Sequence, residues 1–348
     1  MRNFRDHLIF SGSTIKDALV KLNILAEDAI LFVVDKQDKL IGSLTDGDVR
    51  RALIKGITID QEVDTIIQDS PKFIRKGDQD IQKIIRYREG HFRILPVIDA
   101  DDKVINVINF QKTKSYLPVD AVIMAGGRGQ RLQPLTDSTP KPLLKVGDKA
   151  IMQHNVDRLA LYGIDDFWFS VKYLGEQIQD HFGNGSDKNL AISYVWEDTA
   201  LGTIGAVSKI ENFSHDYILV MNSDLLTDLD YEQLFLDFIE RDADFSVVTI
   251  PYNVSIPYAV LETDKGKIKS FKEKPTYTYY SNGGIYLMKK SVLKHIPKEE
   301  FFNATDLIDK LISEELNVIS YPLLGYWLDI GKHEDFNKAQ EDIKHIKF

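Results

Sequence analysis

The sequence predicts an α/β protein in two parts, a small α+β domain over residues 1–115 and a larger domain with a mixed, mainly parallel sheet over residues 119–348. Three observations predict this organisation. The chain has 348 residues with 43% hydrophobic content, enough to bury two cores. Its first part repeats itself, and its second part opens with an apolar strand that runs into a glycine-rich turn.

The repeat relates residues 34–42 to residues 98–106 without gaps, at a constant offset of 64. Each copy has the same order of expected elements: a helix, a β-branched strand, a polar turn, a second short strand and a further helix. Each copy is too small to stand alone, so we expect the two apolar sheet faces to pack against each other. The expected first helices are Ile15–Leu25 and Ile81–Glu89, and the expected first strands are Ile30–Val34 and Ile94–Ile98.

With this order of elements, the run GSLTDGDVR at residues 42–50 resembles the tandem modules named after cystathionine β-synthase, the CBS domains. In that family, Thr or Ser followed three residues later by Asp holds the ribose and phosphate of a bound adenine nucleotide. The resemblance implies this role for Thr45 and Asp48, with an adenine or guanine nucleotide as the ligand. Asn109 and Lys112 stand at the equivalent positions of the second repeat and cannot form such a clamp, so we expect a single site.

Two other interpretations of this region stay open. Thr45 and Asp48 also fit a helix N-cap followed by an acidic residue in the first helical turn. The repeats could also serve mainly for dimerisation, with a vestigial nucleotide site.

A polar linker over residues 112–118 ends in proline and precedes an apolar strand at residues 119–124, which marks a domain boundary. The strand runs into the turn AGGRGQRL at residues 125–132. Glycines let backbone N–H groups approach phosphate oxygens closely, so the turn is a candidate phosphate cradle. It lacks the Gly-Lys-Ser/Thr ending of a P-loop and the third glycine of the dinucleotide-binding fingerprint.

The continuation QPLTDSTPKPLL at residues 133–144 places two cations, Arg131 and Lys141, on either side of one loop. The whole run resembles the signature of the sugar-1-phosphate nucleotidyltransferases, a family with a Rossmann-like α/β fold. The resemblance implies that Arg131 contacts the departing pyrophosphate and that Lys141 contacts phosphates at the reacting centre. Gln130 stands where the family usually has Thr or Ser. The residues implied in nucleotide binding are Ala125, Gly126, Gly127, Gly129, Arg131 and Gly202.

Two aspartates follow in the family's order. Asp224 comes directly after an apolar strand pattern, and the carboxyl end of a strand is where α/β proteins form ligand sites. Asp329 lies in the run WLDIGK, which matches the family's late Asp-x-Gly element. The resemblance implies that both hold Mg²⁺, a cation that takes carboxylates together with substrate phosphate oxygens. The alternative for Asp224 is a helix N-cap, for which Asp228 and Asp230 are better placed.

The remaining segments resemble those that bind the sugar phosphate in the same family. They are FKEKP at residues 271–275, SNGGIY at residues 281–286, and Glu197 with the run LGTIG after it. In this resemblance Glu273 accepts hydrogen bonds from sugar hydroxyls and Lys274 neutralises the sugar's phosphate. A charged strand end and a hairpin turn are the alternative interpretation. The residues implied in sugar-phosphate binding are Lys141, Glu197, Gly202, Glu273, Lys274 and Asn282.

These motifs imply a magnesium-dependent enzyme that transfers a nucleotidyl group to a sugar 1-phosphate and releases pyrophosphate. The pairing with CBS modules resembles bacterial guanylyltransferases for hexosamine or manno-type sugars, so we expect GTP and glucosamine 1-phosphate as substrates. The alternatives are a uridylyl- or thymidylyltransferase acting on glucose 1-phosphate, and an inactive, nucleotide-sensing regulator. The attacking phosphate is already ionised, so no general base is required. The implied catalytic residues are Arg131, Lys141, Asp224, Lys274 and Asp329.

The composition narrows the partners and the compartment. A net charge of −10 argues against a nucleic-acid binder, because neutralising a phosphate backbone requires a basic face. The absence of cysteine excludes disulfides, thiolate nucleophiles and cysteine-based zinc sites. The N-terminus is too short and too charged for a signal peptide, and no apolar run approaches the roughly 20 residues of a membrane-spanning helix. We therefore expect a soluble, cytoplasmic protein without membrane partners, and we also expect a homo-oligomer.

Overall fold

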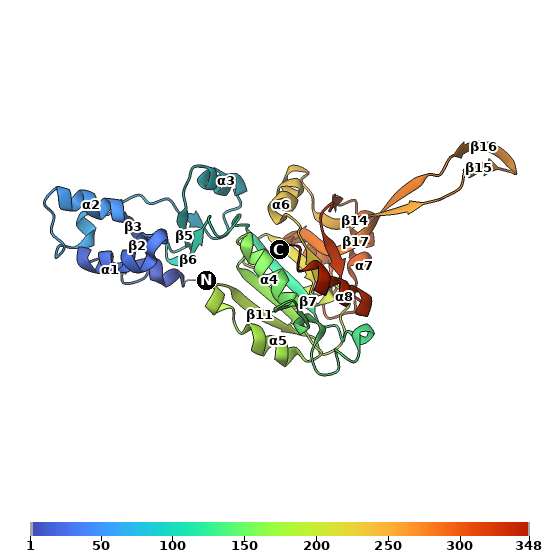
Figure 1. Ribbon diagram of the computed structural model, residues 1–348, viewed down its shortest axis with the longest axis horizontal. Helices are drawn as coiled ribbons and strands as arrows, with labels where there is room; N and C mark the ends of the chain where they lie inside the picture. The colour runs from blue at the N-terminus through green and yellow to red at the C-terminus, as the bar shows by residue number, and fades with distance from the viewer. Residues whose placement is uncertain (1–2, 347–348) are drawn as a thin grey trace.

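The computed structural model describes residues 3–346, with the repeats at one end and a long hairpin at the other (Figure 1). Each repeat forms a three-stranded sheet, in the order β1-β2-β3 and β4-β5-β6, whose first pair is parallel and whose second pair is antiparallel. The elements of the repeats are β1 (Leu8–Phe10), α1 (Ile15–Leu25), β2 (Ile30–Val34), β3 (Leu40–Thr45), α2 (Asp46–Ile54), β4 (Ile74–Arg75), α3 (Ile81–Glu89), β5 (Ile94–Ile98) and β6 (Val104–Asn109).

The two sheets repeat each other down to individual pairs. Ile30 pairs with Thr45 in the first repeat, and Ile94 pairs with Asn109 in the second, 64 residues later at both positions. The register slips at the equivalent place in both hairpins, between residues 33 and 34 and between residues 97 and 98. The same short sequence pattern therefore gives the same local structure twice, which confirms the predicted repeat.

The two repeats contact each other through strands and through side chains. The Leu40 N–H donates to the Asp102 carbonyl oxygen at 3.0 Å, and the Val104 N–H donates to the Asp38 carbonyl oxygen at 2.9 Å. A shared apolar cluster lies between the sheets. It consists of Leu8, Phe32, Val34, Ile94, Ile98 and Val104.

The C-terminal part is built on a seven-stranded sheet in the order β11-β10-β7-β12-β17-β14-β18. Four neighbouring pairs are parallel and two are antiparallel, which confirms the predicted mixed, mainly parallel sheet. Its strands are β7 (Val119–Ala125), β10 (Asp166–Val171), β11 (Ala191–Trp196), β12 (Tyr217–Asn222), β14 (Phe245–Ser255), β17 (Thr276–Lys289) and β18 (Val318–Pro322).

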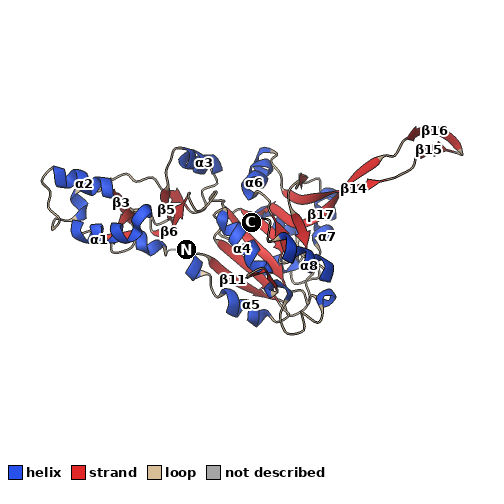
Figure 2. Ribbon diagram, viewed as in Figure 1, coloured by secondary structure: helices blue, strands red, loops and turns tan. Residues whose placement is uncertain are grey.

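Helices cover both faces of this sheet (Figure 2). Alternate residues of β7 point to opposite faces, so Ala121 and Ile123 join one apolar cluster and Val122 joins the other. Helices α4 (Ile151–Leu161), α5 (Gly175–Phe182) and α6 (Tyr231–Glu240) pack on the first face, and α7 (Ala304–Ser313) packs on the second. The last helix, α8 (His333–Asp342), lies beside the short hairpin of β8 (Lys145–Val146) and β9 (Lys149–Ala150).

The second repeat also packs against the C-terminal part. Ile81, Ile84 and Leu95 belong to the same apolar cluster as β7 and α4. Arg88 of α3 binds Glu232 of α6 through two hydrogen bonds of 2.9 and 3.0 Å. The division of the chain at residues 115–119 stays a prediction, because this cluster continues across it.

A long hairpin, residues 252–280, projects from the sheet and is called the arm (Figure 1). It continues the β14–β17 ladder and ends in a two-stranded tip of β15 (Val260–Asp264) and β16 (Lys267–Lys272). None of its residues is buried. Within residues 3–346, no helix is both long and apolar enough to cross a membrane.

Candidate active site

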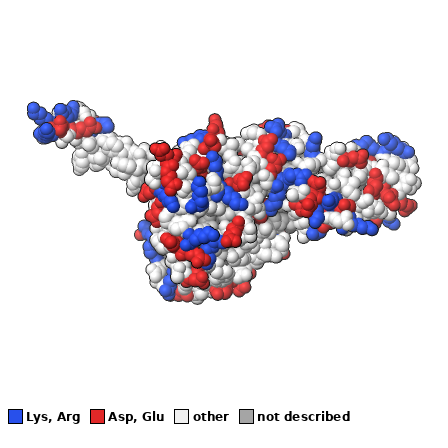
Figure 3. All heavy atoms as spheres, turned by 180° about the vertical axis from the view of Figure 1, so that it is seen from behind, with Lys and Arg blue, Asp and Glu red and all other residues white. Residues whose placement is uncertain are grey.

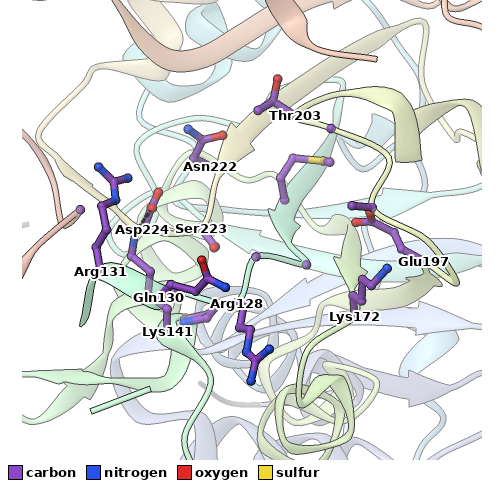
Figure 4. A pocket seen from close by; sticks show the side chains of 18 of the residues that line it. Arg128, Gln130, Arg131, Lys141, Lys172, Glu197, Thr203, Asn222, Ser223 and Asp224 are labelled. Atoms are coloured by element: carbon purple, nitrogen blue, oxygen red, sulfur yellow. Dashed lines mark hydrogen bonds and ion pairs between the residues drawn. The ribbon is translucent and has the colours of Figure 1, made fainter. Parts of the chain in front are cut away.

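The main cavity lies at the carboxyl edge of the parallel strands, where α/β proteins place their ligands (Figure 4). Strands β7, β10, β11 and β12 end there, and the residues that follow them, such as Gly126, Lys172, Glu197 and Ser223, line the cavity. Its volume is about 630 Å³, enough for a nucleotide. The predicted residues that line it are Gly126, Gly127, Gly129, Arg131, Lys141, Glu197, Gly202 and Asp224.

The floor of the cavity is formed where Gly126 meets Glu197. A Cβ atom at residue 126 would lie 2.6 Å from the Glu197 Oε1 atom, so only glycine fits. Glu197 is itself fixed, because its Oε1 accepts a hydrogen bond from the Ser170 hydroxyl and its Oε2 accepts one from the Leu201 N–H at 3.0 Å. Ala125, also predicted to bind nucleotide, ends β7 and is buried beneath this turn.

The loop over residues 126–144 is held in place by several hydrogen bonds. Gly129 has a φ of 65°, and its carbonyl accepts from the Thr136 hydroxyl at 2.9 Å. The Tyr173 hydroxyl donates to the Thr136 carbonyl at 3.0 Å, and the Gln177 amide donates to the Ser138 carbonyl at 3.0 Å. The loop that carries both predicted cations is therefore an ordered part of the cavity wall.

A small sheet brings the two predicted metal ligands together. β13 (Leu225–Thr227) pairs antiparallel with β19 (Trp327–Asp329), with Leu225 opposite Asp329. The Ile330 N–H donates to the Asp224 carbonyl at 3.0 Å, which extends the same strand pairing by one residue. Asp224 and Asp329 are separated by more than 100 residues in the chain, and this pairing makes them neighbours.

The chemistry of the pair fits a hard divalent cation. Each carboxylate has a buried Oδ1 atom with no hydrogen-bond partner among the described residues. Burial and the neighbouring charge of Asp224 raise the pKa of Asp329, as expected for two carboxylates that lie close together. The Lys141 ammonium forms an ion pair with the other oxygen of Asp224. Two carboxylates with free oxygens are a donor set that Mg²⁺ accepts.

Four cations surround the cavity. Figure 4 shows Arg131 and Lys141 beside Asp224, with Lys172 near Glu197 on the other side. Arg128 also lines the cavity, with its guanidinium 5.3 Å from the centre of the Tyr173 ring. Sequence reasoning missed Arg128 and Lys172. The signal was present, because Lys172 follows β10 directly and Arg128 lies inside the glycine turn.

A second, smaller cavity of about 270 Å³ adjoins the first and shares Thr203 and Asn222 with it. Asn282 lines this cavity, and its side-chain oxygen accepts hydrogen bonds from the Gly284 N–H at 2.9 Å and the Tyr286 hydroxyl at 3.0 Å. The segment that contains Asn282 is part of strand β17 and not a hairpin turn. Asp329 reaches this cavity as well, so the carboxylate pair lies between the two spaces.

The structure does not bring Glu273 and Lys274 to either cavity. Both are exposed residues of the arm, at the joint between its ladder and its tip. They therefore lie apart from the ten other predicted transferase-site residues that line the main cavity or its neighbour. Strand β17 extends from Asn282 away from the cavities, and Glu273 and Lys274 lie beyond its far end. Their predicted role therefore depends on what the arm contacts.

In the first repeat, Thr45 and Asp48 contact each other. Thr45 caps α2, the Asp48 N–H donates to its hydroxyl at 3.3 Å, and the same hydroxyl donates to Asp48 at 2.6 Å. Burial raises the pKa of Asp48, but hydrogen bonds from Thr45 and Arg51 outweigh it and lower the pKa overall. This geometry is that of a capping box, and the nucleotide-binding role of the pair stays a prediction.

The equivalent residues of the second repeat have a different contact. The Asn109 amide donates to Asp28 of the first repeat at 2.8 Å, and the Lys112 ammonium pairs with the other oxygen of the same carboxylate. The pair Asn109 and Lys112 therefore joins the two repeats.

Another acidic cluster lies at the opposite, amino edge of the sheet. The ligand atoms of Asp165, Asp166 and His215 lie within 4.8 Å of one another. The Lys76 ammonium from the second repeat is 2.8 Å from Asp166 and supplies a positive charge to the group. The cluster therefore acts as an ionic contact between the second repeat and the sheet, away from the main cavity.

Comparison with known proteins decides the family. Residues 120–346 match the family described as nucleotidyl transferase, and residues 8–55 match the CBS domain. The chain belongs to the nucleotidyl transferase family. The match begins at the second residue of β7, covers the rest of the seven-stranded sheet and includes Asp224 and Asp329, and it confirms the resemblance seen in the glycine-rich turn.

The relatives differ in their named substrates. The chain is 31% identical over 252 residues to a UTP–glucose-1-phosphate uridylyltransferase of Synechocystis, with 65% of each chain covered, just under two thirds. It is 29% identical to a D-glycero-α-D-manno-heptose 1-phosphate guanylyltransferase of Aneurinibacillus thermoaerophilus, covering 65% of this chain and 99% of that protein. The solved structure of HddC from Yersinia pseudotuberculosis complexed with GMP-PN is 25% identical, with a TM-score of 0.50 over 64% of this chain and 99% of that one.

Proposed function

We propose that this protein is a magnesium-dependent sugar-1-phosphate nucleotidyltransferase. The observation that carries the proposal is the pair of carboxylates, Asp224 and Asp329, each with an unpartnered buried oxygen, beside Lys141 and Arg131 at one side of the main cavity. A protein that only sensed a nucleotide would not need two such carboxylates between the main cavity and the smaller one. Transfer of a phosphoryl group between two anionic substrates requires this concentration of opposite charges.

The reaction is an attack by an oxygen of the sugar's phosphate on the α-phosphorus of a nucleoside triphosphate. A new bond forms between that oxygen and the α-phosphorus, and the bond from the α-phosphorus to the bridging oxygen of pyrophosphate breaks. The electron pair leaves with the pyrophosphate, and no proton is transferred because the nucleophile is already an anion. The work of the protein is therefore to hold the partners in line and to neutralise charge.

Named residues divide this work. The backbone of Gly126, Gly127 and Gly129 lets the triphosphate lie close to the turn. Arg131 stabilises the leaving pyrophosphate, and Lys141 exchanges its contact with Asp224 for one with substrate phosphate. Asp224 and Asp329 are the residues that would hold Mg²⁺, which when bound neutralises charge on the phosphates.

We propose GTP as the first candidate nucleotide and glucosamine 1-phosphate as the first candidate sugar. A guanylyltransferase relative that this chain covers over 99% of its length, and a fold neighbour solved with GMP-PN, support the choice of guanine. The uridylyltransferase relative supports UTP with glucose 1-phosphate as the alternative. No described contact distinguishes the two bases.

The experiment is a substrate panel. The purified chain is incubated with Mg²⁺, each common nucleoside triphosphate including dTTP, and a series of hexose, hexosamine and heptose 1-phosphates, and pyrophosphate release is followed. Release confined to one pair supports the proposal and names both substrates. A folded protein that releases no pyrophosphate with any pair would contradict it.

A further inference from the structure

For its length, the arm exposes far more large apolar side chains than the rest of the described molecule. Of the 21 large hydrophobic side chains that are exposed among residues 3–346, eight lie within its 29 residues. Tyr258 is 76% exposed and Phe271 is 65% exposed. Exposed apolar groups gathered in one place mark a surface that another protein surface covers.

The charge of the arm indicates what covers it. Residues 252–280 carry five lysines and three carboxylates, whereas the whole chain has a net charge of −10. Figure 3 shows the lysine side chains at its tip, with carboxylates among them, beyond a neck of uncharged residues. A basic arm on an acidic protein is complementary to a second copy of the same chain.

The smaller cavity lacks what an anionic sugar phosphate requires. Among the described residues that line it there is no lysine, arginine or histidine, and Asp329 contributes a negative charge. The four cations Arg128, Arg131, Lys141 and Lys172 line the main cavity and not the smaller one. The second space is therefore incomplete as a site for a phosphate group.

The arm carries suitable cations, but its own cavity is out of reach. The β14–β17 ladder continues without interruption from the pair Thr249–Asn282 to the pair Ser255–Thr276. Lys274 lies eight residues before Asn282, so at about 3.3 Å per residue it is roughly 25 Å from the cavity. Bringing it back within one chain would break several pairs of this ladder, whereas entering a second copy breaks none.

We propose that two copies exchange their arms, and that Lys274 of each copy enters the smaller cavity of the other and faces the sugar phosphate there. The exchange is symmetric, so both sites are completed at once. Lys274 has a φ of 43°, a conformation that costs energy in a lysine, at the joint where the arm turns into its tip. Exposed Phe301, which lines the mouth of the main cavity, offers an apolar surface for the incoming aromatic side chains.

This inference rests on the proposed function, since it names the origin of one group in the transferase site. It is tested by complementation between two inactive variants. Lys274→Ala has a defective arm and an intact cavity, and Asp224→Asn has an intact arm and a defective cavity. The two are produced together with different affinity tags, and the mixed dimer is isolated by both tags in turn.

Arm exchange predicts that each variant alone loses at least tenfold in turnover. The mixed dimer should recover about half of the wild-type rate, because one of its two sites combines the intact cavity of one copy with the intact arm of the other. A mixed dimer as inactive as its parents, with active wild-type protein alongside, would refute exchange and leave the proposed function standing. A Lys274→Ala protein as active as wild type would also overturn it.

Sedimentation tests the same contact without any substrate. Serine at both Tyr258 and Phe271 should convert the dimer to monomers, whereas Ile54→Ser, which removes an 80% exposed apolar residue from α2, should leave it dimeric. A dimer that persists in the arm variant, or a wild-type chain that is monomeric at assay concentration, would contradict the exchange. If the wild-type chain were inactive with every substrate, this measurement would still show whether the arm holds the dimer together.

Discussion

Replacing Lys76 by methionine should destabilise the protein by an amount that grows with pH. The Lys76 ammonium is 2.8 Å from one oxygen of Asp166 and 3.0 Å from the other. At 2.8 Å and an effective dielectric constant of about 20, one such pair attracts by about 6 kcal/mol. Desolvation cancels much of this, and the lysine side chain is 26% exposed, so we expect a net loss of about 2–3 kcal/mol at pH 8.

The sign of the pH dependence follows from the two carboxylates. Burial raises the pKa of Asp166, but the hydrogen bond from His215 and the charge of Lys76 outweigh it and lower the pKa overall. The stability that this lowered pKa contributes is present above the unfolded-state pKa and is lost as pH falls through the folded-state value. Burial and the charge of Asp166 raise the pKa of Asp165, and Lys76 opposes that shift.

Without Lys76, both carboxylates have higher pKa values, so protonation of the carboxylates as the pH falls relieves part of the loss. The variant should therefore be closest to wild type at pH 5 and furthest from it at pH 8. Urea unfolding of both proteins at the two pH values measures the difference. The control is Lys36→Met, which removes an exposed lysine from the turn after β2 and should change stability by less than about 0.5 kcal/mol. A loss at Lys76 that is equal at both pH values would refute the ionic contact.

Three further predictions concern the site and the first repeat. Asp224→Asn or Asp329→Asn should lower turnover roughly 100-fold or more, and should raise the Mg²⁺ concentration that gives half-maximal rate, while unfolding by urea changes little; unchanged metal dependence would exclude the pair as ligands. Gly126→Ala should lower the free energy of unfolding in urea by about 2 kcal/mol, because the new Cβ atom meets Glu197. Gly127→Ala should leave it unchanged, because no heavy atom lies within 4 Å of a Cβ atom at that position. Equal stability of the two variants would contradict the described turn. Thr45→Ala should cost about 1 kcal/mol whether or not AMP, ATP or GTP is added, and a loss seen only with one nucleotide present would favour the ligand role over the cap.

The sequence was sufficient for the features that depend on local patterns. The 64-residue offset predicted two copies of one unit, and the structure repeats even the slip in strand register. The glycine turn after β7 could be identified because strand, glycines and cations lie within one short stretch.

Features that depend on long-range packing could not be predicted. Asp224 and Asp329 were paired only through the order of the family's motifs, since the β13–β19 contact that joins them leaves no local signal. The course of the arm was missed for a similar reason, because the alternation of residues in β14 and β17 is the same whether the hairpin folds back or projects. The shared core of the second repeat and the sheet depends on surface shape, which a repeat pattern does not encode.

The central claim is that the chain moves a nucleotidyl group from a nucleoside triphosphate to a sugar phosphate. The most direct test follows the α-phosphate in a reaction with α-labelled GTP, Mg²⁺ and glucosamine 1-phosphate. The other triphosphate and sugar pairs of the panel are run in parallel, each triphosphate labelled at its α-phosphate. The account predicts that the α-label appears in a nucleoside diphosphate sugar while unlabelled pyrophosphate is released in equal amount. Label that stays in every triphosphate of the panel with every sugar, or that appears only in a nucleoside mono- or diphosphate without a sugar attached, would contradict it.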